Sequence, residues 1–272
     1  PTAILCHTAP ANSYKQLKPN EMSDLAIKEL LDKLADDLLL LGHRNTEWTG
    51  IGPLLEEHIA FSSMAQDKIG QSLALYELLE QLGEADPDKV AFMRNAQQFH
   101  NCQLVELPIG EYEFSLMRHF LFDHSAILRF QELANSSYQP LALVSRKLVG
   151  ELRYHVMHAD TFIKQLGTAT EESIARMQTA LNMAISYALG IFEKSPYEEA
   201  LISQGVFSGE DQLFHLWHQN VASIIAETSL KMPDLQLEAG KMGGRMGKHT
   251  EHLQPLLDEM AEVFKLDPEA EW

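Results

Sequence analysis

The chain has 272 residues, of which 45% are hydrophobic and 22% charged, a composition typical of a globular protein and unlike that of a disordered or collagen-like chain. Lysine and arginine number 21 against 39 aspartates and glutamates, so the net charge is −18. This acidity makes nucleic acids and anionic membrane surfaces poor partners, because like charges repel.

Cys6 and Cys102 are too few for a disulfide framework or a zinc knuckle, which indicates a reducing compartment. No run of about 18 apolar residues occurs, and the N-terminal segment lacks the basic start and apolar centre of a signal peptide. We therefore expect a cytoplasmic chain without a membrane anchor. Residues 1–22 are predicted to form a loose N-terminal arm, and residues 23–272 one helical domain.

Apolar residues recur with the period of an α-helix along most of the chain. The first stripe runs from Ile27 to Leu41 behind a cap at Ser23. HRNTEWTGIGP then interrupts the pattern, and Pro53 suits the first position of a second helix that extends to Leu82. Further helices are predicted over residues 88–99, 111–134, 140–166, 170–193, 210–230 and 250–264.

These elements predict an all-α fold, because β-strand patterns are nearly absent. NCQLVELPIG, between the second and third long helices, has no helical stripe and is expected to be an extended connector. Four long helices with one long crossover are the arrangement of the ferritin-like four-helix bundle, to which the C-terminal helices would be additions. Other helical bundles share the same periodicity.

Ferritin-like bundles commonly hold a di-iron centre, which takes a Glu from each of two helices and Glu-x-x-His from each of the other two. None of the twelve histidines has an acidic residue three positions before it, so this ligand set cannot be assembled. Pairs with His-x-x-His spacing could in principle bind zinc, but no cysteine or third ligand is near them and we interpret them as chance spacings. They are His155/His158, His215/His218 and His249/His252.

A series of motifs then runs in order along the chain: HRNTEW, GPLLEEHIAFSSMAQDKIGQS, QFHNCQLVELPIGEY, FLFDHSAIL, GELRYHVMHAD and GGRMGKHTEHLQPLLDEM. From about Leu30 to Trp272 the sequence resembles the non-catalytic ferritin-like C subunits of the bacterial phenylacetyl-CoA epoxidases. The resemblance implies a place in an assembly that converts phenylacetyl-CoA to its ring 1,2-epoxide with molecular oxygen and electrons from a reductase. It implies an iron-bearing catalytic paralogue, a small bridging subunit and the reductase as partners, and it is compatible with a homodimer.

The resemblance further implies that the di-iron centre belongs to the paralogue, and that this chain binds no cofactor and keeps only remnants of the metal site. Glu47 stands where the first-helix Glu ligand would lie. Where the paralogue has Glu-x-Gly-His on its second helix, this chain has Lys68 and Gln71, and the fourth-helix Glu is replaced by Leu152. The remnant positions are Glu47, Lys68, Gln71, Asp123, Leu152 and His155.

A bundle core that has lost its metal ions must neutralise any carboxylates left behind, because a buried unpaired charge is costly. We expect Lys68 to replace iron electrostatically by pairing with Glu47 or Asp123, and Gln71 to bond to either. The alternative is that Lys68 reaches solvent and apolar packing closes the core. Glu151 is expected to lie at an edge of the bundle.

The glycine-rich tail gathers Arg245, Lys248 and His249, which could cradle a phosphate. Given the resemblance, they are candidates for contact with coenzyme A or with the partner subunit, although a glycine-rich helix connector explains the composition equally well. The apolar helix over Ile174–Phe192 is a candidate docking face.

Two other classes of function remain open. One is an independent di-iron enzyme with an unconventional ligand set of Glu47, Asp123, Glu151 and His155. The other is a helical interaction module that binds zinc through a His-x-x-His pair.

Overall fold

The computed structural model describes residues 19–270, with side chains from Ser23 onward except that of Glu238. Residues 1–18, most of the predicted arm, and residues 271–272 lie outside the described residues. Between residues 19 and 270 there is no β-strand, and the all-α prediction is confirmed. The α-helices are α1 (Pro19–Thr46), α2 (Leu55–Gln81), α3 (Pro87–Phe92), α4 (Tyr112–Leu133), α5 (Gln139–Leu166), α6 (Glu171–Ala188), α7 (Glu198–Ser203), α8 (Glu210–Ala226) and α9 (Leu253–Ala261).

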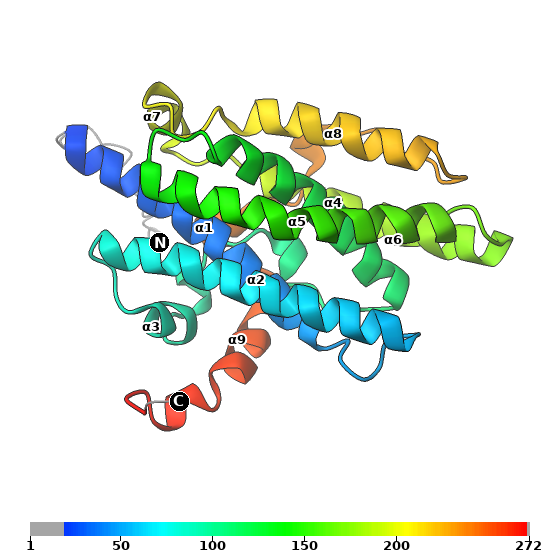
Figure 1. Cartoon of the computed structure of the whole chain (residues 1–272), viewed down its shortest axis with the longest axis horizontal. Coiled ribbons are helices and arrows are strands. Elements are labelled where there is room, and N and C mark those ends of the chain that lie inside the picture. The colour runs from blue at the N-terminus through cyan, green and yellow to red at the C-terminus, as the bar shows by residue number, and fades with distance from the viewer. Residues whose placement is uncertain (1–18, 271–272) are drawn as a thin grey trace, which may run out of the picture.

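The helices α1, α2, α4 and α5 form a four-helix bundle. α1 packs along α2, α4 packs along α5, and α2 also contacts α5, which joins the two pairs. In Figure 1, α5 lies between α2 and α8, and these helices follow the long axis of the molecule. Residues 82–111 cross from the first pair to the second, which is the predicted crossover. The ferritin-like fold with additional C-terminal helices is therefore confirmed.

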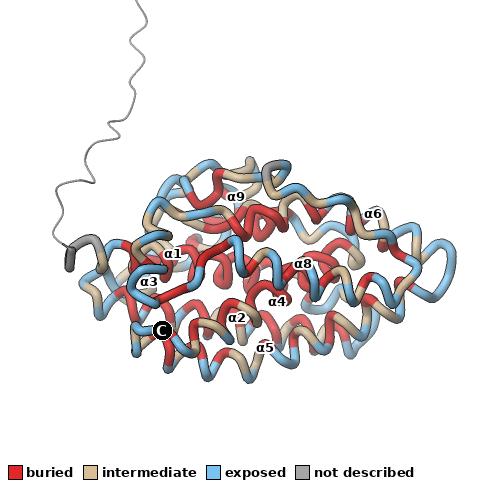
Figure 2. Tube along the Cα trace, turned by 90° about the horizontal axis from the view of Figure 1, so that it is seen from above, coloured by how far each residue is buried: buried red, intermediate tan, exposed pale blue. Residues whose placement is uncertain are grey.

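The core of the bundle is apolar and continuous. α1 is buried on almost every side from Leu30 to Leu41, because α2, the crossover and the C-terminal segments all pack around it. In Figure 2 the buried residues gather along the middle of the molecule and the exposed ones face outward. None of the helices described is long and apolar enough to span a membrane.

Several helix boundaries differ from the predictions. α1 begins at Pro19 and continues to Thr46, so residues 19–22 are helical and do not belong to a loose arm. The helix predicted over residues 88–99 ends at Phe92, because the Asn95 side chain caps a separate 3-10 turn over Ala96–Gln98. The short helix α7 was not predicted.

The helix predicted over residues 170–193 ends at Ala188 and continues as a 3-10 turn over Leu189–Phe192. The turn places Gly190 against the tail, where a Cβ atom on Gly190 would overlap the carbonyl oxygen of Lys241. The last helices are shorter than predicted, since α8 ends at Ala226 and α9 spans only Leu253–Ala261.

Buried acidic residues on α1 hold the crossover in place. The Asp36 carboxylate accepts a hydrogen bond of 2.6 Å from the Tyr76 hydroxyl and one of 2.7 Å from the backbone N–H of His100, and it pairs with Arg94. Burial would lower the pKa of Arg94, but the charge of Asp36 raises it above its ordinary value. These bonds explain why a segment with little regular structure follows a defined path.

The next residue, Asp37, joins the crossover to the tail. Its carboxylate accepts hydrogen bonds of 2.7 Å from the backbone N–H of Cys102 and from Nη2 of Arg245. Further along the crossover, Glu106 accepts hydrogen bonds of 2.7 and 2.6 Å from the backbone N–H and hydroxyl of Thr250, and its Oε1 lies 2.6 Å from Nδ1 of His249. The tail is thus an integral part of the domain.

Candidate functional site

An ion pair lies at the centre of the bundle. The ammonium group of Lys68 on α2 donates a hydrogen bond to Oδ1 of Asp123 on α4, and both side chains are fully buried. Lys68 Nζ also lies 5.2 Å from the centre of the Phe122 ring. Burial would raise the pKa of the Asp123 carboxyl, but the positive charge of Lys68 and the contact with His119 hold it well below its usual range.

Two histidines lie against the same carboxylate. Nδ1 of His119, one turn before Asp123 on α4, contacts Oδ2, and Nδ1 of His155 on α5 lies 4.0 Å from that atom. The other ring nitrogen of His155 lies 3.0 Å from Oδ2 of Asp67. Burial lowers the pKa of His119 to about 4, so its imidazole is neutral at pH 7.

The polar cluster continues toward the start of α4. The ring centroids of His119 and His158 are 5.4 Å apart, and Nε2 of His158 lies 3.0 Å from Oε1 of Glu57 on α2. The Tyr112 hydroxyl donates a hydrogen bond of 2.6 Å to Oε2 of Glu57. Burial would raise the pKa of Glu57, but the hydrogen bonds from His158 and Tyr112 lower it.

Not every polar atom of this interior has a hydrogen-bond partner. Nδ1 of His119 and Oδ2 of Asp123 contact each other without forming a hydrogen bond, and the other atoms without one are Nε2 of His119, Nδ1 of His155 and of His158, and Oε1 of Gln71. Buried polar atoms are normally paired, so such a group is uncommon in a bundle core. The cluster is thus a group of polar side chains surrounded by the apolar core of the bundle.

Lys68, Asp123 and His155, three of the positions expected to be remnants of a metal site, are brought together. Lys68 pairs with Asp123 and does not reach solvent. Glu47, by contrast, follows the last residue of α1, its side chain is 35% exposed, and it pairs with Arg44 at 2.8 Å. The expected alternative pairing of Lys68 with Glu47 is wrong, because Glu47 lies beyond the end of the helix that would have carried it into the core.

The remaining remnant positions have other neighbours. Nε2 of Gln71 donates a hydrogen bond of 2.9 Å to Oε2 of Glu151, so the expected bond from Gln71 to Glu47 or Asp123 is wrong. The pair lies where α2 and α5 meet, and Glu151 is partly exposed there. Leu152 is fully buried in the apolar core.

Sequence reasoning did not assign five members of the cluster to a site: Glu57, Asp67, Tyr112, His119 and His158. The four-residue spacing of His119 and Asp123, which places both on one face of a helix, was a usable signal. His158 was interpreted as part of a chance spacing. Glu57 could not be found in this way, because its contact with His158 joins residues far apart in the sequence.

These residues do not fit a di-iron centre. An ammonium group is bonded to the central carboxylate, and Leu152 offers no donor where a second carboxylate would be required. Among the side chains that the structure describes, which are those of residues 23–270 except Glu238, no group of three or more histidines, cysteines, aspartates or glutamates is placed to hold a metal ion. The unconventional ligand set is not brought together either, since Glu47 pairs with Arg44 and Glu151 bonds to Gln71.

The tail residues proposed to contact coenzyme A or a partner have different positions. Arg245 is buried, paired with Asp37, and bonded to the carbonyl oxygens of His100 and Ile191 at 2.9 and 3.2 Å. Nδ1 of His249 bonds to the Glu106 carboxylate. Both side chains therefore have partners within the domain, and Lys248 alone of the three is exposed.

Comparison with known proteins places this architecture in a family. The model of a family described as phenylacetic acid catabolic protein matches residues 13–272. The chain is also 33% identical, over 241 residues, to the C subunit of the 1,2-phenylacetyl-CoA epoxidase of Escherichia coli strain K12, a match that covers 88% of this chain and 96% of the relative. Because both matches span nearly the whole helical domain, the chain belongs to the family of phenylacetic acid catabolic proteins.

Proposed function

We propose that this chain is the non-catalytic, C-type subunit of a multicomponent oxygenase that epoxidises the ring of phenylacetyl-CoA. The identity with the Escherichia coli epoxidase subunit supports the place in the complex. The observation that carries the non-catalytic role is the buried pair of Lys68 and Asp123 at the centre of the bundle. A fixed ammonium group beside the carboxylate supplies the positive charge that a metal ion would otherwise supply.

In this proposal the chain binds no iron, and the di-iron centre belongs to an iron-bearing paralogue. The paralogue, a small bridging subunit and a reductase are the proposed partners, and the complex acts in the cytoplasm, where acyl-CoA thioesters are formed. The role of this chain is to dock onto the iron-bearing subunit, stabilise it and shape its substrate entrance. The polar contacts that fix the crossover and the tail to α1 support this role, since a docking surface must hold its shape.

Co-expression with the iron-bearing subunit tests the proposal. We expect the two chains to co-purify. After the subunits are separated, the iron should remain with the other subunit. Turnover of phenylacetyl-CoA with the reductase should require both chains. A purified preparation of this chain alone that carries about two irons per chain and turns over phenylacetyl-CoA would refute the non-catalytic role.

A further inference from the structure

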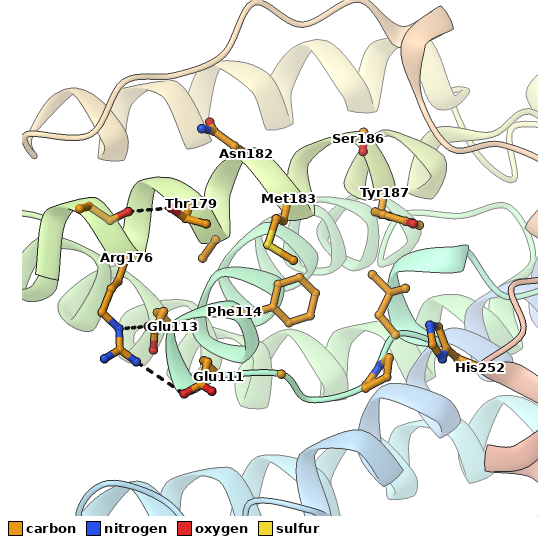
Figure 3. A pocket seen from close by; sticks show the side chains of 15 residues that line it. Glu111, Glu113, Phe114, Arg176, Thr179, Asn182, Met183, Ser186, Tyr187 and His252 are labelled. Atoms are coloured by element: carbon orange, nitrogen blue, oxygen red, sulfur yellow. Dashed lines mark hydrogen bonds and ion pairs between the residues drawn. The ribbon is translucent and has the colours of Figure 1, made fainter. Parts of the chain in front are cut away.

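A large groove lies between α4 and α6, and none of the residues of the buried cluster lines it. It has a volume of about 930 Å³ and is lined by the end of the crossover, the start of α4, the outer face of α6 and His252. We call it the α4–α6 groove. In Figure 3 the side chains of Phe114 and Met183 point toward each other in its middle, with His252 at one end and Arg176 at the other.

One end of the groove is acidic. Arg176 lies 3.5 Å from Glu111, and its Nε donates a hydrogen bond to Glu113 (Figure 3). Glu172, which lines a neighbouring hollow, lies 3.9 Å from Arg176. Glu111 and Glu172 each have 82% of the side chain exposed. Two carboxylates, Glu111 and Glu113, and one guanidinium line this end of the groove, and Glu172 adds a third carboxylate beside Arg176, so negative charges outnumber positive ones there. Arg176 is the only lysine or arginine among the residues that line the groove.

The apolar surface continues beyond this acidic end. A second hollow of about 420 Å³ shares Glu113 and Arg176 with the α4–α6 groove and is lined in addition by Leu54 and Phe162. Leu54 belongs to the connection between α1 and α2. Large apolar side chains of this connection and of the start of α2 are exposed to solvent, namely Ile51, Leu54, Leu55 and Ile59. Together the two hollows form a long apolar surface with carboxylates near its middle.

The charge of this surface decides what kind of molecule it suits. A coenzyme A thioester carries several phosphate charges, and the carboxylates of Glu111 and Glu172 would repel it. A protein segment with apolar side chains and a nearby lysine or arginine complements both the apolar surface and its charge. Exposed apolar surface rimmed by polar groups is typical of a protein–protein contact.

We propose that the α4–α6 groove docks a basic segment of the iron-bearing subunit. An apolar side chain of that segment inserts between Phe114 and Met183, and its lysine or arginine lies beside Glu111 and Glu172. This inference rests on the proposed function, since it names the surface and the chemistry by which the two subunits meet. It also extends the sequence-based expectation that the helix over Ile174–Phe192 is a docking face.

Matched variants of the full-length chain test the inference by titration with the purified iron-bearing subunit. Met183→Glu places a charge in the groove, and Met157→Glu on α5 is its control, because both side chains are 58% exposed. Glu111→Lys/Glu172→Lys reverses the charge of the acidic end. Its control is Glu199→Lys/Glu262→Lys, at two exposed glutamates outside the groove. Thermal melts establish that each variant is folded.

We expect both groove variants to weaken binding by about tenfold or more and both controls to stay within about twofold of the unmodified chain. Binding of the unmodified chain should weaken between about 0.1 and about 1 M NaCl, because salt screens the carboxylates. Groove variants that bind normally would overturn the inference and leave the proposed function intact. An equal loss with Met157→Glu would also overturn it, since the α4–α6 groove would then not be the docking site. Failure of the unmodified chain to bind would refute the proposed function and this inference together.

Discussion

The side chains of Lys68 on α2 and Asp123 on α4 meet in the middle of the bundle, and neither is exposed to solvent. A buried ion pair contributes little net stability when it is intact, because desolvation of the two charges offsets their attraction. Removal of one partner is different, since the other charge then remains buried and unpaired. The pair therefore makes the core depend on the presence of both residues.

Lys68→Met should destabilise the fold by about 3–5 kcal/mol, because the substitution leaves the Asp123 carboxylate without its cation. The free energy of unfolding measured with urea gives the comparison. Lys147→Met, at an exposed position on α5, is the matched control and should change this free energy by less than about 0.5 kcal/mol. The double variant Lys68→Met/Asp123→Leu should recover most of the loss. An unchanged melting temperature for Lys68→Met would show that the pair does not hold the core together.

His119 should make the fold less stable as the pH falls from 6.5 to 4. In the unfolded chain its imidazole binds a proton near pH 6.5, whereas burial lowers the pKa in the fold to about 4. Between these values the unfolded state binds more protons, so acid favours unfolding, by up to about 3 kcal/mol at pH 4.

His119→Gln should flatten the dependence of the unfolding free energy on pH in this window. His215→Gln, at an exposed histidine on α8, should leave it unchanged. Urea unfolding at several pH values between 4 and 7.5 provides the measurement. A slope that is the same in His119→Gln and in the unmodified chain would mean that another group takes up the proton.

Replacement of Arg245 and replacement of Lys248, two cationic residues of the tail, should have very different effects on stability. Arg245→Met leaves the buried Asp37 carboxylate without its ion-pair partner and should cost about 3–5 kcal/mol. Lys248→Met, three residues away and exposed, should cost less than about 0.5 kcal/mol. Unfolding in urea measures both, and limited proteolysis should cut the tail faster only in Arg245→Met. Similar costs for the two variants would contradict the structural role of Arg245.

Removal of metal ions should not affect the stability of the chain. The cluster around Asp123 is neutralised by Lys68, so dialysis against a chelator should leave the melting temperature unchanged in calorimetry. A fall in melting temperature that zinc restores would point instead to a metal bound through histidines. Iron that remains bound to this chain at a stoichiometric level after gel filtration would contradict the proposal that the di-iron centre belongs to the other subunit.

Much of the architecture could be read from the sequence because the helical period records which face of each helix is buried. The stripe from Ile27 to Leu41 predicted a buried first helix, and the break around Pro108 and Gly110 predicted the crossover. The predicted ends of helices differ from the observed ends where side-chain caps and packing determine where a helix stops. Gly190 illustrates this, since its close approach to Lys241 accompanies a turn that periodicity alone reads as helix.

The sequence by itself determined that the chain is helical and that the standard di-iron ligand set cannot be assembled, since no histidine has an acidic residue three positions before it. These conclusions depend only on residue types and their spacing along single helices. The tertiary structure decided that Lys68 meets Asp123 and not Glu47, that Arg245 turns inward to Asp37, and that an apolar groove with one acidic end forms beside α6. Such contacts join residues far apart in the chain, and a pattern within one helix carries no information about which side chain of another helix will face it.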